Sequence, residues 1–192
     1  MEPNIELIQI PIKTDKSFLN IYTLSDNILT NKCISEISDK LGLSYGRNTG
    51  FFSDKYKKDY YYAIFKVAKR HPLTPSLSIL LDYINNLFQT DYNGILINKY
   101  DTGKNFIVKH SDSKNHPAIG VMIISVGATR TFRVRDKYTD QIVANIPLIE
   151  GQMIHMGGNF QTEFTHEVPC EESVTGVRYS INFHRYEGLG LY

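Results

Sequence analysis

From Gly94 onward the sequence alternates short β-forming segments with turn residues, and this pattern restricts the fold more than any other feature. Eight segments can be assigned, and they cover residues 95–100, 106–112, 119–126, 131–136, 142–148, 152–156, 164–168 and 177–184. Eight short strands at such intervals are typical of a β-sandwich or a barrel. The segment from Ile119 to Ile124 is apolar on both faces, which predicts a strand buried between two layers.

Two segments in the first half have the apolar spacing of helices. One is predicted to begin with Ser25 or Asp26 as its N-cap and to end near Leu41, before a glycine. The other is better defined, because Thr74 can cap its first turn and apolar residues then recur at helical spacing up to Phe88. We expect both helices to buttress the sheet.

Composition agrees with one folded domain. The chain has 192 residues, of which 42% are hydrophobic and 21% charged, and its formal net charge is +1. No apolar run has the length of a transmembrane helix, and residues 1–4 lack the basic start of a signal peptide. We therefore expect a soluble, intracellular protein with no membrane partner. Cys33 and Cys170 are expected to stay thiols, since two cysteines without an export signal give little reason for a disulfide.

The tripeptide His110-Ser111-Asp112, followed far downstream by His166, predicts a metal site. Side chains two apart on a strand point to the same face, so His110 and Asp112 can reach one ion together. Two imidazoles and one carboxylate leave half of an iron's coordination sphere open for a cosubstrate and oxygen. The tripeptide taken alone is more often surface polarity, so its interpretation depends on its neighbours.

Residues 55–70 combine cations with aromatic rings. Six basic residues accompany a single acid, Asp59, so the segment is locally positive. Cations that hold phosphates, together with rings that stack on bases, make up a nucleic-acid surface. A solvated pair of strands whose tyrosines pack on the core would have the same composition, and both interpretations stay open at this point. The residues concerned are Lys55, Tyr56, Lys57, Lys58, Tyr60, Tyr61, Tyr62, Phe65, Lys66, Lys69 and Arg70.

The block from Gly94 to Arg185 resembles the AlkB-like family of Fe(II) and 2-oxoglutarate dependent dioxygenases in the order and spacing of its motifs. These motifs are Asn98-Lys99-Tyr100, Asp101-Thr102-Gly103, His110-Ser111-Asp112, Ile124-Ser125-Val126-Gly127, Arg130-Thr131-Phe132, Met156-Gly157-Gly158, Gln161, His166-Glu167-Val168-Pro169 and Arg178-Tyr179-Ser180-Ile181-Asn182-Phe183. About half of the chain is covered. The conjunction is far more specific than any single motif.

The resemblance implies an α+β fold with a mainly β core, a double-stranded β-helix or jelly roll. Residues 1–192 would form one dioxygenase domain, in which residues 1–93 supply the buttressing helices and a nucleotide-recognition lid and residues 94–186 the catalytic core. The segment 42–58, which contains Gly46 and Gly50, is predicted to be the most mobile. Nucleic-acid contacts implied for the lid and its surroundings are Tyr45, Arg47, Tyr61 and Lys114.

The resemblance also assigns roles to individual residues. His110, Asp112 and His166 would be the catalytic metal ligands for Fe(II), and Arg178 would hold the far carboxylate of 2-oxoglutarate with its planar fork. The remaining residues implied at the cosubstrate are Asn98, Tyr100, Ser180, Asn182 and His184. In isolation, Asn98 and Tyr100 would be interpreted as an ordinary strand residue and a packed tyrosine.

The implied reaction is the oxidative removal of N-alkyl groups from nucleic-acid bases, as in repair, with Fe(II), 2-oxoglutarate and O2 as cofactors and aldehyde, succinate and CO2 as products. The partner would be DNA or RNA, single-stranded or with a base flipped out of the stack, and the protein is expected to be a monomer. An oxygenase of the same fold acting on a protein or small molecule is the alternative. A barrel that only binds is disfavoured, because it has no need of four converging ligands.

Two positions depart from the family pattern. The closing strand of the family usually carries a second arginine, where this chain has His184, and Arg185 should point to the opposite face. This predicts weaker 2-oxoglutarate binding than in a typical member. Lys114 stands where members that repair methylated adenine or cytosine commonly have an acid, and a lysine cannot accept a hydrogen bond from an exocyclic amine.

Overall fold

The computed structural model describes residues 6–12, 14–24, 28–63, 66–112 and 119–186. A nine-stranded sheet forms the centre of the fold. Its strands lie in the order β1 (Glu6–Gln9), β2 (Ser17–Thr23), β13 (Gln152–Gly158), β10 (Val121–Gly127), β15 (Arg178–His184), β8 (Gly94–Tyr100), β4 (Arg47–Phe52) and β3 (Gly42–Ser44), with β7 (Arg70–His71) beside β4. A smaller sheet has the order β12 (Ile142–Leu148), β11 (Arg130–Asp136), β14 (Phe164–Val168) and β9 (Ile107–His110), and β5 (Tyr60–Ala63) pairs with β6 (Lys66–Ala68).

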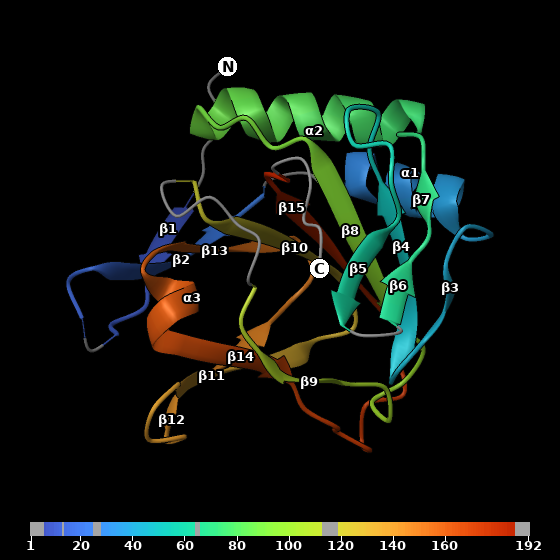
Figure 1. Cartoon of the computed structure of the whole chain (residues 1–192). Coiled ribbons are helices and arrows are strands. Elements are labelled where there is room, and N and C mark those ends of the chain that lie inside the picture. The colour runs from blue at the N-terminus through green and yellow to red at the C-terminus, as the bar shows by residue number, and fades with distance from the viewer. Residues whose placement is uncertain (1–5, 13, 25–27, 64–65, 113–118, 187–192) are drawn as a thin grey trace.

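Helices cover one face of the large sheet. Figure 1 shows α1 (Ile28–Ile37) and α2 (Pro75–Phe88) together on one side of it, and the strands of the small sheet on the other. Thr74 caps α2 as predicted, since its side chain accepts a hydrogen bond from the Leu77 N–H, and Pro75 occupies the first turn. The predicted start of the first helix lies outside the described residues, and α1 ends at Ile37, four residues before Leu41.

Two apolar cores separate these three layers. The outer core lies between the helices and the large sheet, and the inner core lies between the two sheets. The run predicted to be buried on both faces contributes to both cores: Met122 and Ile124 face the helices, while Val121 and Ile123 face the small sheet. A short helix, α3 (Phe160–Glu163), connects β13 to β14 and buries Phe160 in the inner core.

The predicted jelly roll is confirmed, although some strand positions differ from the prediction. Each of the eight predicted β segments contains a strand, but the segment 106–112 does not run to its end, because β9 stops at His110. The segment 42–58 was predicted to be mobile. Residues 42–52 instead form a hairpin of β3 and β4 that extends the large sheet beside β8. The strands β1 and β2 were not predicted. The strand β2 pairs with β13, more than a hundred residues away, and β1 pairs with β2.

Cys33 is buried and Cys170 exposed, and both are free thiols, as expected. Among the described residues, no helix combines the length and the apolar character needed to cross a membrane.

Candidate metal centre and cosubstrate site

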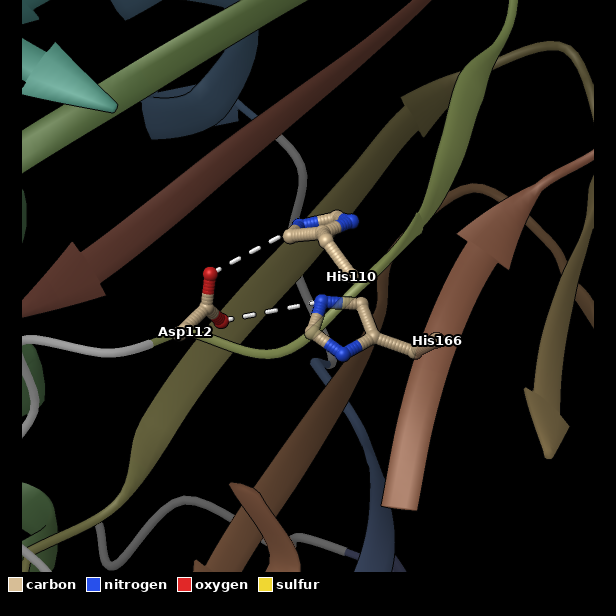
Figure 2. A group of neighbouring side chains, drawn as sticks. All are labelled: His110, Asp112 and His166. Carbon is tan, nitrogen blue, oxygen red and sulfur yellow. Dashed lines mark ion pairs between the residues drawn. The ribbon is translucent and has the colours of Figure 1, made fainter. Parts of the chain in front are cut away.

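Three side chains from separate positions in the sequence converge on the inner side of the small sheet. His110, at the end of β9, lies directly opposite His166 on β14, and Asp112 follows two residues after β9. One ligand atom from each lies within 4.8 Å of the other two. The two carboxylate oxygens of Asp112 are each 3.6 Å from one imidazole Nε2, as Figure 2 shows.

Asp112 does not share a strand with His110, so that part of the prediction is wrong. Its backbone leaves the sheet and is held by other contacts. The Asp112 N–H donates to the Gln161 side chain on α3 at 2.8 Å, and the Ser111 hydroxyl donates to the Phe164 carbonyl at 2.8 Å. These two bonds turn the chain so that the carboxylate faces the imidazoles from outside the strand.

The hydrogen bonds of His110 prepare it to bind a metal. Its Nδ1 lies 2.9 Å from the Val108 carbonyl oxygen, which can only accept, so Nδ1 carries the proton. The lone pair of the neutral ring is then on Nε2, the nitrogen nearest Asp112. A backbone carbonyl that fixes the tautomer in this way is common behind metal-binding histidines.

His166 is held rigidly in a dry environment. Its ring stacks on Phe132, with centroids 5.2 Å apart, and only 4% of the residue is exposed. Burial lowers the pKa of His166 to about 3, with the nearby His110 adding to the effect and Asp112 opposing it. The ring is therefore neutral at physiological pH and able to offer a lone pair. Two imidazoles and one carboxylate fit Fe(II) with open positions.

A stripe of polar side chains runs along the inner face of the large sheet. The strands β8 and β15 pair with Tyr100 opposite Arg178 and Asn98 opposite Ser180, so all four side chains share one face. Asn98 donates to the Ser180 hydroxyl at 3.3 Å, and Asn182 donates to the same hydroxyl at 3.2 Å. The structure thus brings most of the predicted cosubstrate residues into one connected group.

Arg178 is the buried cation of this stripe. It is 1% exposed, its Nε donates to the Ser125 hydroxyl at 3.0 Å, and its guanidinium lies 5.3 Å from the centroid of the Tyr100 ring. Burial lowers the pKa of Arg178 from its usual value. Its Nη1 is buried and has no hydrogen-bond partner among the residues that the structure describes. A buried N–H donor without an acceptor costs free energy, and a bound anion that accepts its hydrogen bond removes this cost. The position of Arg178 therefore fits a carboxylate of 2-oxoglutarate.

His184 lies at the other end of β15. The six residue steps from Arg178 to His184 correspond to about 20 Å of extended strand. His184 is 3% exposed and contacts the Tyr186 ring at 5.3 Å. Burial lowers its pKa, and the charge of Asp112 opposes this effect. Arg185 instead forms an ion pair with Asp91. Weaker 2-oxoglutarate binding stays a prediction.

Of the four residues predicted to contact nucleic acid, the three that the structure describes differ in exposure. Tyr45 and Tyr61 are exposed, as such contacts require. Arg47 is only 6% exposed, and its Nε donates to the Asn98 side-chain oxygen at 2.7 Å, so it belongs to the polar stripe rather than to the outer surface. Lys114 lies outside the described residues. Nucleic-acid contact by any of them stays a prediction.

Sequence reasoning missed part of an aromatic cluster that consists of Phe51, Tyr56, Tyr60 and Tyr186. The Tyr186 ring lies 4.8 Å from Phe51, 5.1 Å from Tyr60 and 5.8 Å from Tyr56, measured between centroids. Burial raises the pKa of Tyr186 well above its usual value, with Tyr60 and Asp112 adding to the effect. Within the described part of the chain, its buried hydroxyl has no hydrogen-bond partner. The signal was available, because Tyr186 continues the every-second-residue pattern of β15 beyond His184.

A family model described as the 2OG-Fe(II) oxygenase superfamily matches residues 34–184. The chain belongs to this superfamily. The expected cofactors, Fe(II), 2-oxoglutarate and O2, are confirmed at the level of the superfamily, and the cluster of His110, Asp112 and His166 fits the iron.

Individual relatives of this 2OG-Fe(II) oxygenase support the AlkB-like resemblance. The human protein "DNA oxidative demethylase ALKBH2" is 28% identical over 123 residues, which cover 59% of this chain and 47% of the relative. The human "Alpha-ketoglutarate-dependent dioxygenase alkB homolog 3" is 31% identical over 121 residues, which cover 57% of this chain and 42% of the relative. The chain thus spans about half the length of the curated relatives it matches.

A solved structure described as "The structure of OsALKBH1" has the same fold. It aligns with a TM-score of 0.61 and 13% identity, over 93% of this chain and 100% of the solved chain. At this identity the likeness concerns the fold alone.

Proposed function

We propose that this oxygenase oxidatively removes N-alkyl groups, methyl above all, from nucleic-acid bases. The observation that carries the proposal is the convergence of His110, Asp112 and His166, together with the buried Arg178 on the inner face of the large sheet, whose Nη1 has no hydrogen-bond partner among the described residues and suits a dicarboxylate. The similarity to a protein named as a DNA oxidative demethylase supports the choice of substrate.

Each part of the site has a distinct task in this proposal. His110, Asp112 and His166 hold Fe(II), and Arg178 holds the far carboxylate of 2-oxoglutarate while Tyr100 lies against the guanidinium. Once bound, the iron and cosubstrate supply the oxidising power that hydroxylates the alkyl carbon on nitrogen. The hydroxylated group then leaves the base as an aldehyde. Burial of the stripe excludes water from the cosubstrate.

The aromatic cluster is the proposed wall of the base pocket. Asp112 adds to the raised pKa of Tyr186, which supports a short distance between Asp112 and the aromatic cluster. A base stacked against the cluster would then lie near the proposed iron ligands. Flat π faces accept any base, and stacking offsets part of the cost of flipping, roughly a few kcal/mol. Lys55, Lys57 and Lys58 are exposed next to this cluster in sequence and can contact phosphates.

The test is succinate formation with methylated and unmethylated oligonucleotides of the same sequence. We expect the methylated strand to raise the rate at least about tenfold, a barrier difference of roughly 1.4 kcal/mol, with one aldehyde released per additional succinate. An Asp112→Ala variant, which lacks the carboxylate ligand, is the matched control and should form none. Equal rates with both strands would reject the proposal. Stimulation by a peptide or small molecule alone would favour the alternative oxygenase.

The same assay decides the predicted base preference. Lys114 predicts that 3-methylthymine, which presents carbonyl oxygens, is used at least as well as 1-methyladenine and 3-methylcytosine. A strong preference for 1-methyladenine would contradict that prediction and leave the demethylase proposal intact.

A further inference from the structure

Arg130 is a buried arginine with no part in the proposed chemistry, although it belongs to a motif that the sequence drew attention to. It is the first residue of β11 and is 1% exposed. Its guanidinium donates to backbone carbonyls in the turn after β8, to a backbone carbonyl after β14 and to one carboxylate. The acceptors are Glu171 Oε2 at 2.9 Å, Pro169 O at 2.6 Å, Asn105 O at 2.8 Å, Thr102 O at 3.2 Å and Gly103 O at 3.3 Å.

Glu171 completes the clamp. Besides the Arg130 side chain, its carboxylate accepts the Thr131 N–H at 3.0 Å and the Thr131 hydroxyl at 2.7 Å. The Glu171 N–H donates to the Gly103 carbonyl at 2.8 Å. A Cβ on Gly103 would lie 1.8 Å from the Glu171 carbonyl oxygen, so only glycine permits this approach. The turn after β8 is thereby tied to the loop between β14 and β15.

This clamp acts on Tyr100, the last residue of β8. The Arg130 guanidinium lies 5.6 Å from the Tyr100 ring centroid, and the Arg178 guanidinium lies 5.3 Å from the same centroid. Both distances are within the range of cation–π attraction, which is stronger where water is excluded. Tyr100 is 2% exposed, so two cations and the turn that follows it restrict where its hydroxyl can point.

We propose that Arg130, fixed by Glu171, is a positioning residue that sets the orientation of Tyr100 for 2-oxoglutarate binding, an inference that rests on the cosubstrate site of the proposed function. Glu171 neutralises the charge of Arg130, so Arg178 carries the positive charge that is left for the dicarboxylate. Arg130 itself does not touch the cosubstrate in this proposal, because each of its three guanidinium nitrogens donates to the clamp. A purely structural role would stabilise the loops without changing the affinity for 2-oxoglutarate.

The experiment measures 2-oxoglutarate binding by calorimetry on the Mn(II)-loaded protein, together with Mn(II) affinity. Arg130→Lys keeps the charge but loses the fork. We expect it to weaken 2-oxoglutarate binding about tenfold, the value of one charged hydrogen bond, and to change Mn(II) affinity less than about twofold. In a Tyr100→Phe background the same substitution should change 2-oxoglutarate affinity less than about twofold, since interacting residues are non-additive.

Three further arms keep the test decisive. Arg133→Lys on the same strand removes a guanidinium that pairs with Glu167 at 3.6 Å, and it should leave 2-oxoglutarate affinity unchanged. If Arg130→Lys does not fold, Glu171→Gln enters the same cycle with the same expected result. Full additivity with Tyr100→Phe, or no loss in the wild-type background, overturns the inference. If Arg178→Met also leaves the affinity unchanged, the proposed cosubstrate site itself is wrong.

Discussion

The two faces of the large sheet bury side chains of opposite kinds on the same strands. On β15, Ile181 and Phe183 point outward into the helix-covered core, whereas Arg178 and Ser180 point inward. Both faces are equally dry. Apolar side chains buried on the outer face stabilise the fold. The inner face contains hydrogen-bond donors that have no acceptor among the described residues, such as Arg178 Nη1. Stability and binding should therefore respond oppositely to substitutions on the two faces.

The largest effect is expected on the outer face. Leu77 in α2 is fully buried in the outer core, and Leu77→Ala should lower the free energy of unfolding by about 2–5 kcal/mol, because a cavity is left behind. Chemical denaturation measures this, and Ile79→Ala, at an exposed position of the same helix, is the control that should cost less than about 0.5 kcal/mol. A changed 2-oxoglutarate affinity in folded Leu77→Ala protein would break the separation of the faces.

The next largest effect is expected on the inner face, where a substitution should change 2-oxoglutarate binding rather than reduce stability. Arg178→Met should weaken 2-oxoglutarate binding by about 1.5–3 kcal/mol, as expected for losing hydrogen bonds to a charged group. The free energy of unfolding should stay the same or rise, because a buried and incompletely paired cation is replaced by an apolar chain of similar length. Calorimetry and denaturation on the same samples check both. A large loss of stability would show that the cation supports the fold.

A smaller effect, the pH dependence of stability, is expected from a histidine buried among apolar side chains. His155 packs between Phe18 and Phe88, and burial lowers its pKa from the usual 6.5. Below about pH 6.5 the imidazole is protonated in the unfolded chain but not in the folded chain. The contribution of His155 to the free energy of unfolding is therefore complete above about pH 6.5 and falls as the pH drops, by at most about 1.4 kcal/mol per pH unit. Denaturation at pH 7.5 and 5.5 should show a shallower dependence in His155→Gln. An unchanged dependence would assign the effect to other histidines.

The smallest effect is expected outside both faces. Lys57 and Lys58 are exposed and should contact phosphates only. Replacing both by alanine should reduce the salt dependence of oligonucleotide binding by about 0.7–0.9 per lysine in the slope of log K against log salt. Stability and 2-oxoglutarate affinity should not change. Titrations at several salt concentrations measure the slope, and an unchanged slope would remove these residues from the nucleic-acid surface.

Local signals explain why much of the fold could be predicted. The strands after Gly94 and the helix capped by Thr74 follow from residue spacing over a few turns, and the structure has both. The strand β2 was missed because its place is decided by pairing with β13, more than a hundred residues away. The metal ligands were found by type and order, but the position of Asp112 depends on Gln161 and a bent backbone that spacing does not encode.

The sequence by itself determined which groups could do chemistry: two histidines, one aspartate and an arginine in a fixed order, with alternation that sends every second side chain of β15 to one face. Only the folded arrangement shows that Arg47 donates to Asn98 within the polar stripe and that Arg130 donates to the carbonyl of Thr102 in the turn after Tyr100. The physical reason is that alternation is a property of one strand, whereas distances between strands depend on register and pairing between segments far apart in the chain.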